Sequence, residues 1–357
     1  MNTELNEFQI MLFSKNIYIA VILSVLFLPL TLIFYIIVSI RHFMYDSGLL
    51  RSFKPDIFTV SVGNITVGGT GKTPTVISLV NSLKDKKIKP LVVTGGYGRK
   101  STGRIIIKDN TTVSESGDEP LTIYNKTKAS VICDRDRVSA IKDMSDNYDI
   151  VVLDDAFQHR KVKKNLDLVL IDESRFLGNR LLLPSGILRD TVSRLKYCDV
   201  IILSKVKDLN SASVKEKLAY LKKFEKKILI SKLYSGYVSD GRSKTDISAV
   251  SGMNISLFCG IGYPEDFFDI FAELKIVSNK AYPDHCVYSE KEFSEFAVMK
   301  QNSEMIITTY KDFVKIPNNV TAEFNIRYLD IDLKFFDEFN NAFNISDIIK
   351  GIDIGKK

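Results

Sequence analysis

Short apolar runs without polar alternation recur along the middle of the chain, and polar or turn-forming residues bound each of them. Strands that are covered on both faces of a sheet have this pattern. Helical stretches, such as the apolar-periodic one at 74–83, fall between several of the runs, and this order predicts a mostly parallel α/β sheet. The predicted strands lie at 57–62, 91–94, 131–133, 150–153, 168–171 and 200–204.

A second, smaller α/β unit is predicted beyond a polar, turn-rich stretch at 239–251, which we interpret as a linker. Its strands are expected at 255–260, 305–309 and 326–333, and its helices at 264–274 and 290–299. The pattern therefore divides the chain into an N-terminal segment (1–45), a larger α/β domain (46–245) and a smaller C-terminal α/β domain (246–357).

The N-terminal segment contains 24 uncharged and mainly apolar residues, Ile17 to Ile40. A helix of this length crosses a hydrocarbon core of about 30 Å. A retained membrane anchor is favoured over a cleaved signal peptide, which would have a small-residue cleavage site, and over a buried core helix. Pro29 could instead break the helix so that it lies in one leaflet. The positive charges at Arg41, Arg51 and Lys54 predict that the remaining chain is cytoplasmic.

Composition narrows the class of protein. The chain has 357 residues, of which 45% are hydrophobic and 26% charged, enough for a buried core in about two domains. Its four cysteines form no C-x-x-C pair, so neither a zinc site nor a disulfide framework is indicated. The net charge of +6 includes lysine-rich runs at 84–89, 161–164 and 222–227. Such runs are usually solvated, and attraction to an anionic membrane is the alternative. His42 is expected at the membrane interface.

A phosphate-binding loop is the strongest local signal. The segment Thr66-Val-Gly-Gly-Thr-Gly-Lys-Thr73 matches G-x-x-x-x-G-K-[ST] except at its first position. It lies between a predicted strand and a predicted helix, where backbone N–H groups and the helix N-terminus attract phosphate. The lysine would reach the β- and γ-phosphates of ATP, and the final threonine would bind Mg²⁺. The predicted ATP-binding residues are Thr66, Val67, Gly68, Gly69, Thr70, Gly71, Lys72 and Thr73.

Two carboxylates are candidates for the magnesium site. Asp154 and Asp155 follow an apolar strand, and ligands of open parallel sheets bind at the carboxyl ends of strands. One of the two could instead cap a helix. Together with Thr73 they form the predicted metal site of a P-loop NTPase-like α/β fold.

Several further motifs resemble those of the tetraacyldisaccharide 4′-kinase family of lipid A biosynthesis, in the family order and over almost the whole chain. Departures from the family pattern fall at Gly95, Ala156, Ile187, Asp190 and Cys286, outside the P-loop lysine and the candidate metal ligands. The matching segments are Ser61 to Pro74, Gly96-Tyr-Gly98, Gly117-Asp-Glu-Pro120, Asp134-Arg-Asp-Arg137, Asp154 to Arg160, Leu183 to Asp190, Gly260 to Pro264, Pro283-Asp-His285 and Thr309-Tyr-Lys-Asp312.

The resemblance implies a kinase that uses ATP and Mg²⁺ to phosphorylate the 4′-hydroxyl of a tetraacyldisaccharide 1-phosphate, giving lipid IVA. The glycolipid and the membrane are then its partners, and no nucleic acid or obligate protein partner is expected. Its catalytic domains would lie on the cytoplasmic side of a bacterial inner membrane.

The resemblance also implies residue roles. Lys72 would stabilise the transferred phosphoryl group, Asp118 would accept the hydroxyl proton, and His285 would hydrogen-bond to Asp118. Without the family, Asp118 could equally start a helix, and a lone histidine is more often a packed or surface residue. The implied glycolipid contacts are Asn64, Tyr97, Gln158, His159 and Arg189.

Two other functions stay open at this point. A deviant-Walker partitioning ATPase has a similar loop but carries a lysine where Val67 stands here. A membrane-tethered P-loop ATPase or nucleotide-binding regulator would bind ATP without lipid phosphorylation.

Overall fold

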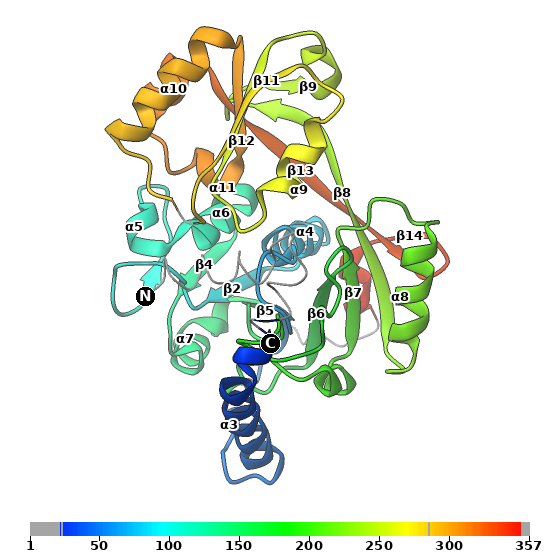
Figure 1. Cartoon of the computed structure of the whole chain (residues 1–357). Helices are drawn as coiled ribbons and strands as arrows, with labels where there is room; N and C mark the ends of the chain where they lie inside the picture. The colour runs from blue at the N-terminus through cyan, green and yellow to red at the C-terminus, as the bar shows by residue number, and fades with distance from the viewer. Residues whose placement is uncertain (1–21, 23, 285, 351–357) are drawn as a thin grey trace. The chain divides into compact units, whose positions relative to one another are not determined.

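The computed structural model describes residues 22, 24–284 and 286–350 (Figure 1). Its contacts divide the chain into two compact units. Unit 1 contains residues up to 95, 134–232 and those from 334, and unit 2 contains 96–133 and 233–333. The predicted division at 245/246 differs from this grouping. The chain passes between the units four times, and composition does not mark these passages. The predicted linker at 239–251 contains the end of one strand and a second strand that pairs with it.

Unit 1 is built on a parallel sheet with the strand order β2-β5-β1-β6-β7-β8. Five of these strands were predicted, and their observed ends lie within two residues of the predicted ones. β8 was not predicted. The strands are β1 (Phe58–Asn64), β2 (Pro90–Thr94), β5 (Ile150–Asp154), β6 (Leu166–Asp172), β7 (Val200–Ser204) and β8 (Lys227–Ser239), the last of which ends in unit 2.

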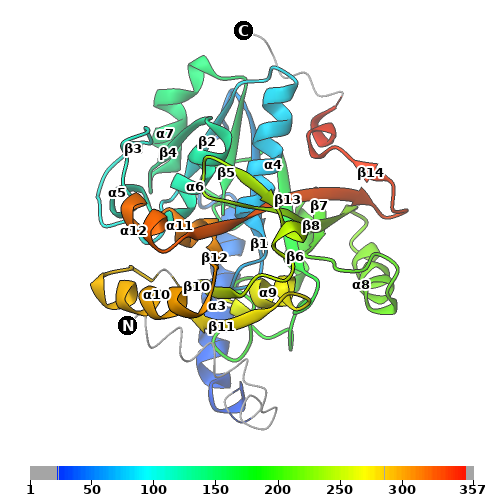
Figure 2. The ribbon, with the colours of Figure 1, turned by 90° about the horizontal axis from the view of Figure 1, so that it is seen from above.

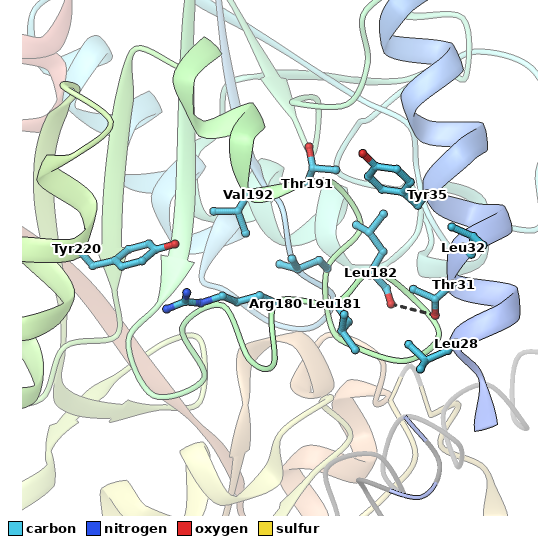
Figure 3. A pocket seen from close by; sticks show the side chains of 11 residues that line it. Leu28, Thr31, Leu32, Tyr35, Arg180, Leu181, Leu182, Thr191, Val192 and Tyr220 are labelled. Carbon is cyan, nitrogen blue, oxygen red and sulfur yellow. Dashed lines mark hydrogen bonds between the residues drawn. The ribbon is translucent and has the colours of Figure 1, made fainter. Parts of the chain in front are cut away.

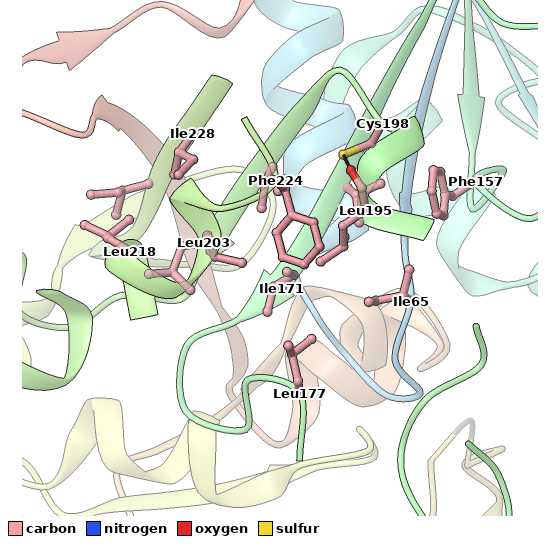
Figure 4. Packing of buried hydrophobic residues seen from close by; sticks show 14 of the residues in the cluster. Ile65, Phe157, Ile171, Leu177, Leu195, Cys198, Leu203, Leu218, Phe224 and Ile228 are labelled. Atoms are coloured by element: carbon pink, nitrogen blue, oxygen red, sulfur yellow. Dashed lines mark hydrogen bonds between the residues drawn. The ribbon is translucent and has the colours of Figure 1, made fainter. Parts of the chain in front are cut away.

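Helices cover this sheet. α4 (Lys72–Asp85) packs on β1, β2 and β5, and α7 (Arg137–Met144) packs on β2. Leu218 of α8 (Ala212–Lys222) and the following Phe224 join Ile171 and Leu203 in a buried cluster (Figure 4). Short elements complete unit 1: η1 (Ser145–Asn147), η2 (Val192–Tyr197), β14 (Ala342–Phe343) and η5 (Ile345–Ile349).

The N-terminal helix α3 (Leu28–Asp46) is long and apolar enough to cross a membrane. Pro29 lies in its first turn, where a missing N–H is tolerated, so it does not break α3. One face of α3 packs on unit 1 through Thr31, Phe34 and Val38, and most of the remaining surface is exposed and apolar. Residues 17–21 and 23 of the predicted span lie outside the described residues.

Two hydrogen-bonded contacts fix α3 to the segment 181–191. Thr31 Oγ1 donates to Ser185 Oγ at 2.7 Å. Near the other end, His42 Nε2 lies 2.8 Å from Asp190 Oδ1, and both side chains are buried. The His42 imidazole is thus the partner of a buried carboxylate, and its expected place at the membrane interface stays a prediction.

Unit 2 contains a parallel sheet in the order β11-β10-β12-β13. Along β10, Leu257 and Cys259 face a core with Phe267, whereas Phe258 faces Phe296 on the opposite side. The helices on these faces, α9 (Pro264–Phe268) and α10 (Glu290–Asn302), are visible in Figure 2. The strands are β10 (Ile255–Cys259), β11 (Ile276–Ala281), β12 (Met305–Thr309) and β13 (Ile326–Asp337), and two antiparallel pairs add β3 (Ile105–Ile106) to β4 (Ser130–Cys133) and β9 (Lys244–Asp246) to β8.

The remaining elements of unit 2 are short helices. The predicted helix 264–274 is split into an α-helix and a 3-10 turn. The helices are α5 (Val113–Ser116), α6 (Asp118–Thr127), η3 (Ile247–Val250), α9 (Pro264–Phe268), η4 (Asp269–Phe271), α10 (Glu290–Asn302), α11 (Tyr310–Phe313) and α12 (Asn318–Glu323).

Gly63 in β1 provides a test of the packing beneath the candidate site. A Cβ atom at this position would lie 2.7 Å from Phe157 Cβ and 2.8 Å from the Phe157 backbone nitrogen. We expect Gly63→Ala to lower the free energy of unfolding by about 1–3 kcal/mol, because backbone cannot move aside easily. Urea unfolding measures this change. Gly69→Ala, where a Cβ atom would meet nothing within 4 Å, is the matched control, and equal stability of both variants would contradict the packing described.

Candidate nucleotide-binding site

The glycine-rich loop joins the carboxyl end of β1 to the first turn of α4, as the sequence predicts. Gly68 and Gly71 have φ values of 92° and 87°, a left-handed conformation that glycine adopts without a steric penalty. Asn64 Nδ2 donates to Thr70 Oγ1 at 2.9 Å, and Ser204 Oγ of β7 donates to the Thr70 carbonyl at 2.8 Å. The loop is therefore held in shape by side chains from two strands.

The segment 187–189 holds the loop from the other side. Val67 N donates to the Ile187 carbonyl at 2.8 Å, and Arg189 N donates to the Ile65 carbonyl at 2.7 Å. The backbone of Leu188 forms an antiparallel bridge with Thr66. These contacts bring the predicted substrate residue Arg189 next to the predicted ATP-binding residues.

Asp155 is the centre of the charged groups around the loop. Arg189 Nη2 and Nη1 donate to its two carboxylate oxygens at 2.8 and 3.1 Å, and Lys72 Nζ lies 3.7 Å from Oδ1. Arg189 also donates to the side-chain oxygen of Asn64. Burial alone would raise the pKa of Asp155, but the charges of Lys72 and Arg189 outweigh it and hold the pKa well below its usual range. Asp155 is therefore ionised and balances both cations.

Asp154 and Thr73 are the other candidate magnesium ligands. Asp154 ends β5, is 2% exposed and accepts a hydrogen bond of 3.3 Å from Thr94. Thr73 lies in the first turn of α4. Both supply hard oxygen atoms, and Mg²⁺ in nucleotide sites takes one or two such ligands and completes its shell with phosphate and water. These residues fit such a metal, whereas the described chain has no cluster of three or more His, Cys, Asp or Glu side chains that could hold an ion by itself.

Arg137 positions both aspartates. Its Nη2 donates to the Asp154 carbonyl at 2.9 Å and its Nη1 to the Asp155 carbonyl at 3.1 Å. A Cβ atom on Gly95 would lie 3.3 Å from Arg137 Nη2. Gly95, one of the positions at which the chain departs from the family pattern, thus lies beside the Arg137 guanidinium.

Gln158 and His159 follow the aspartates. Gln158 Nε2 donates to the Asn64 carbonyl at 2.8 Å, which ties it to the same network. His159 is partly buried, and its Nε2 has no hydrogen-bond partner among the described residues. Burial, together with the positive charges of Arg137 and Lys164, lowers the pKa of His159 to about 4. The imidazole is therefore neutral at physiological pH.

A second group of charges lies within unit 2, around Asp118. This residue begins α6 and is 3% exposed, and its Oδ2 lies 3.5 Å from both Lys311 Nζ and Lys315 Nζ. Lys311 also lies 3.3 Å from Asp284 Oδ1. Burial lowers the pKa of Lys311, but Asp118, Glu119 and Asp284 raise it by more, so the pKa lies above its usual range. Lys311 is therefore a permanent cation beside the candidate base.

Two predicted residues do not belong to the clusters described above. Tyr97, in unit 2, is 70% exposed. His285 lies outside the described residues. The predicted pairing of His285 with Asp118 stays a prediction.

Several residues of these clusters were missed as functional candidates. Arg175 Nη2 lies 3.3 Å from the Gly69 carbonyl and forms a 2.7 Å ion pair with Asp172. Arg137 and Lys311 lie within the family motifs 134–137 and 309–312. A basic residue inside such a motif is the signal that could have identified them. Arg175 has no comparable signal.

These features define a P-loop nucleotide-binding protein. A glycine-rich loop with a lysine joins a central strand of a parallel sheet to a helix, and two aspartates lie at the end of the adjacent strand. Residues 23–347 match the family model described as tetraacyldisaccharide-1-P 4′-kinase. The chain belongs to this family.

Individual relatives agree. The tetraacyldisaccharide 4′-kinase of Idiomarina loihiensis is 30% identical over 326 residues, which cover 89% of this chain and 93% of the relative. That of Francisella philomiragia is 33% identical and covers 88% and 96% of the two chains. The crystal structure of LpxK from Aquifex aeolicus in complex with ATP is similar with a TM-score of 0.70 and 25% identity, over 88% of this chain and 95% of that one.

His159 predicts a pH dependence of stability. In the folded protein it stays neutral down to about pH 4, whereas the unfolded chain takes up this proton near pH 6.5. The free energy of unfolding should therefore fall as pH decreases from about 6.5 to about 4. Urea unfolding of wild type and His159→Gln at pH 7.5, 6 and 5 measures this, and the variant should show a smaller loss. Parallel losses in both proteins would contradict the lowered pKa.

Proposed function

We propose that this chain transfers the γ-phosphoryl group of ATP to the 4′-hydroxyl of a tetraacyldisaccharide 1-phosphate, giving lipid IVA. The observation that carries the proposal is the loop between β1 and α4, whose lysine and neighbouring aspartates are already arranged by Arg189 and Arg137. Membership of the tetraacyldisaccharide-1-P 4′-kinase family supports the choice of acceptor.

The residues of unit 1 would bind and neutralise the triphosphate. Backbone N–H groups from Thr66 to Thr73 would surround the phosphates, and Lys72 would leave Asp155 to contact the β- and γ-phosphates. Thr73 and Asp154, with Asp155 as the alternative carboxylate, would hold Mg²⁺, which neutralises phosphate charge when it is bound. Arg189 would remain paired with Asp155 and balance the negative charge of its carboxylate after Lys72 has moved to the phosphates.

Asp118 is the proposed general base, and His285 its hydrogen-bonding partner. Transfer to an alcohol requires a group that accepts the hydroxyl proton while the oxygen attacks phosphorus. The buried carboxylate of Asp118 is held in place by Lys311 and Lys315, which restricts its orientation. Among the proposed glycolipid contacts, Asn64, Gln158 and Arg189 share one hydrogen-bond network, and Tyr97 and His159 complete the set.

The outer face of α3 is the proposed membrane contact. Ile33 and Ile37 on this face are 55% and 57% exposed. An acylated disaccharide stays in the bilayer, so an enzyme held at the same surface searches two dimensions instead of three. We propose the cytoplasmic side of a bacterial inner membrane as the location, in agreement with the basic residues that follow the apolar segment.

The kinase proposal is tested with purified full-length protein, radiolabelled ATP and tetraacyldisaccharide 1-phosphate in detergent micelles. We expect a bisphosphorylated lipid. Lys72→Ala should lower kcat by about 10²–10³-fold, since it removes a cation that faces the developing charge. Asp118→Asn should lower kcat by about 10²–10⁴-fold with little change in ATP affinity, since a general base acts only in the transition state.

The matched control for Asp118 is Asp109→Asn, an exposed carboxylate of the same unit that pairs with Lys128, and it should retain full activity. ATP hydrolysis without labelled lipid would overturn the kinase proposal in favour of an ATPase. Full activity of His285→Ala would remove that residue from the mechanism.

Membrane binding is tested by replacing Ile33 and Ile37 together with serine. Removing these two exposed side chains should weaken binding to vesicles by about ten- to a hundredfold, because each loses apolar surface that would leave water. Vesicle sedimentation measures the bound fraction. Serine at Val277 and Val298, exposed apolar residues of unit 2, should leave binding unchanged, and unchanged binding of the α3 variant would contradict the proposed contact.

A further inference from the structure

A cavity of about 460 Å³ lies in unit 1 between α3 and the chain segment 180–192 (Figure 3). Leu28, Leu32 and Tyr35 line it from α3, and Val192 and Tyr220 line it from the opposite side. The volume falls in the range of about 300–1,000 Å³ typical of sites for small ligands. None of the residues assigned above to ATP, metal or acceptor lines this cavity.

The walls of the cavity suit hydrocarbon better than water. Thr31 is a polar residue of its lining, but Thr31 Oγ1 donates to Ser185 Oγ at 2.7 Å and accepts from Ser185 N at 3.0 Å. Its hydroxyl is thus engaged within the protein. Six of the eleven lining residues are leucine or valine, whose side chains offer water no hydrogen-bond partner.

The cavity opens toward the surface that would face the membrane. Leu28, Leu32 and Tyr35 are 42%, 59% and 48% exposed, so the same side chains line the cavity and belong to the apolar outer surface of α3. A hydrocarbon chain can therefore enter from a bilayer without crossing water.

Positive charge lies at one edge of the cavity. Arg180 is exposed, its guanidinium carbon lies 4.8 Å from the centre of the Tyr220 ring, and Lys223 Nζ lies 3.2 Å from the same centre. Neither cation has an acidic partner within the described part of the chain. Two unbalanced cations beside an apolar cavity are complementary to a lipid with an anionic head and a hydrocarbon tail.

We propose that this cavity binds one acyl chain of an anionic bilayer glycerophospholipid, with its phosphate at Arg180 and Lys223. The bound lipid is a component of the membrane and not the phosphoryl acceptor, since none of the proposed acceptor contacts lines the cavity. The proposal goes beyond the kinase reaction and does not depend on it.

The absence of tryptophan from the sequence makes the cavity easy to probe. Tyr220→Trp places the chain's single tryptophan in the cavity wall and keeps an aromatic ring there, and Val192→Trp is a second reporter should the first fail to fold. Full-length protein in detergent micelles is titrated with brominated phosphatidylglycerol or brominated phosphatidylcholine. Ile36→Trp, an exposed position of α3 outside the cavity, is the control for non-specific contact.

We expect saturable quenching at position 220, at a lower mole fraction of phosphatidylglycerol than of phosphatidylcholine. Arg180→Gln should reduce this preference by about fivefold, the effect of one cation at a membrane surface, and adding Lys223→Gln should abolish it. ATP affinity should match that of the parent, which confirms folding. Identical, non-saturating quenching at positions 220 and 36 would overturn the proposal. Displacement of the brominated lipid by equimolar tetraacyldisaccharide 1-phosphate would also overturn it, by assigning the cavity to the acceptor.

Discussion

The ion pairs of Asp155 with Arg189 and Lys72 organise the nucleotide site. Both cations are partly buried beside this carboxylate, so each of the three charges has a counter-charge within 4 Å. The P-loop lysine is therefore neutralised before any nucleotide arrives. In the proposed reaction a triphosphate would replace Asp155 as the partner of Lys72, and Arg189 would leave the carboxylate with one cationic partner.

The same arginine connects the electrostatics to the backbone. Arg189 lies in the segment that pairs with the glycine-rich loop, and its own N–H donates to the Ile65 carbonyl. Arg137 acts similarly from α7, because it donates to the carbonyl groups of Asp154 and Asp155. Two guanidinium groups thus fix the loop and the aspartates relative to each other, which is the preorganisation that phosphoryl transfer requires.

The parts of the site that depend on neighbouring residues could be predicted from the sequence. The glycine-rich loop and the aspartates at the end of β5 are local features of a strand and the turn after it. The bidentate contact of Arg189 with Asp155 could not be predicted, because 34 residues separate the two and only the folded sheet edge brings them together. Lys311 is still further from Asp118 in sequence. The family motifs include all four residues, but they do not show which residues contact each other.

In the fold, too, local features could be predicted from the sequence and long-range ones could not. Buried strands such as β5 and β7 were found because each is a run of buried apolar residues that ends in one polar residue, whereas β11 alternates between partly buried and exposed residues and gives a weaker pattern. The unit boundaries were missed for a different reason. β8 and β13 each begin in one unit and end in the other, and no local composition marks that passage.

The attachment of α3 has a practical consequence for protein production. Deleting the first 46 residues to obtain a water-soluble enzyme would remove His42 and Thr31, the partners of Asp190 and Ser185. Asp190, one residue from Arg189, would lose the imidazole that it contacts at 2.8 Å. A shortened protein designed for crystallisation or inhibitor screening would thus lack two anchors of the segment that pairs with the glycine-rich loop.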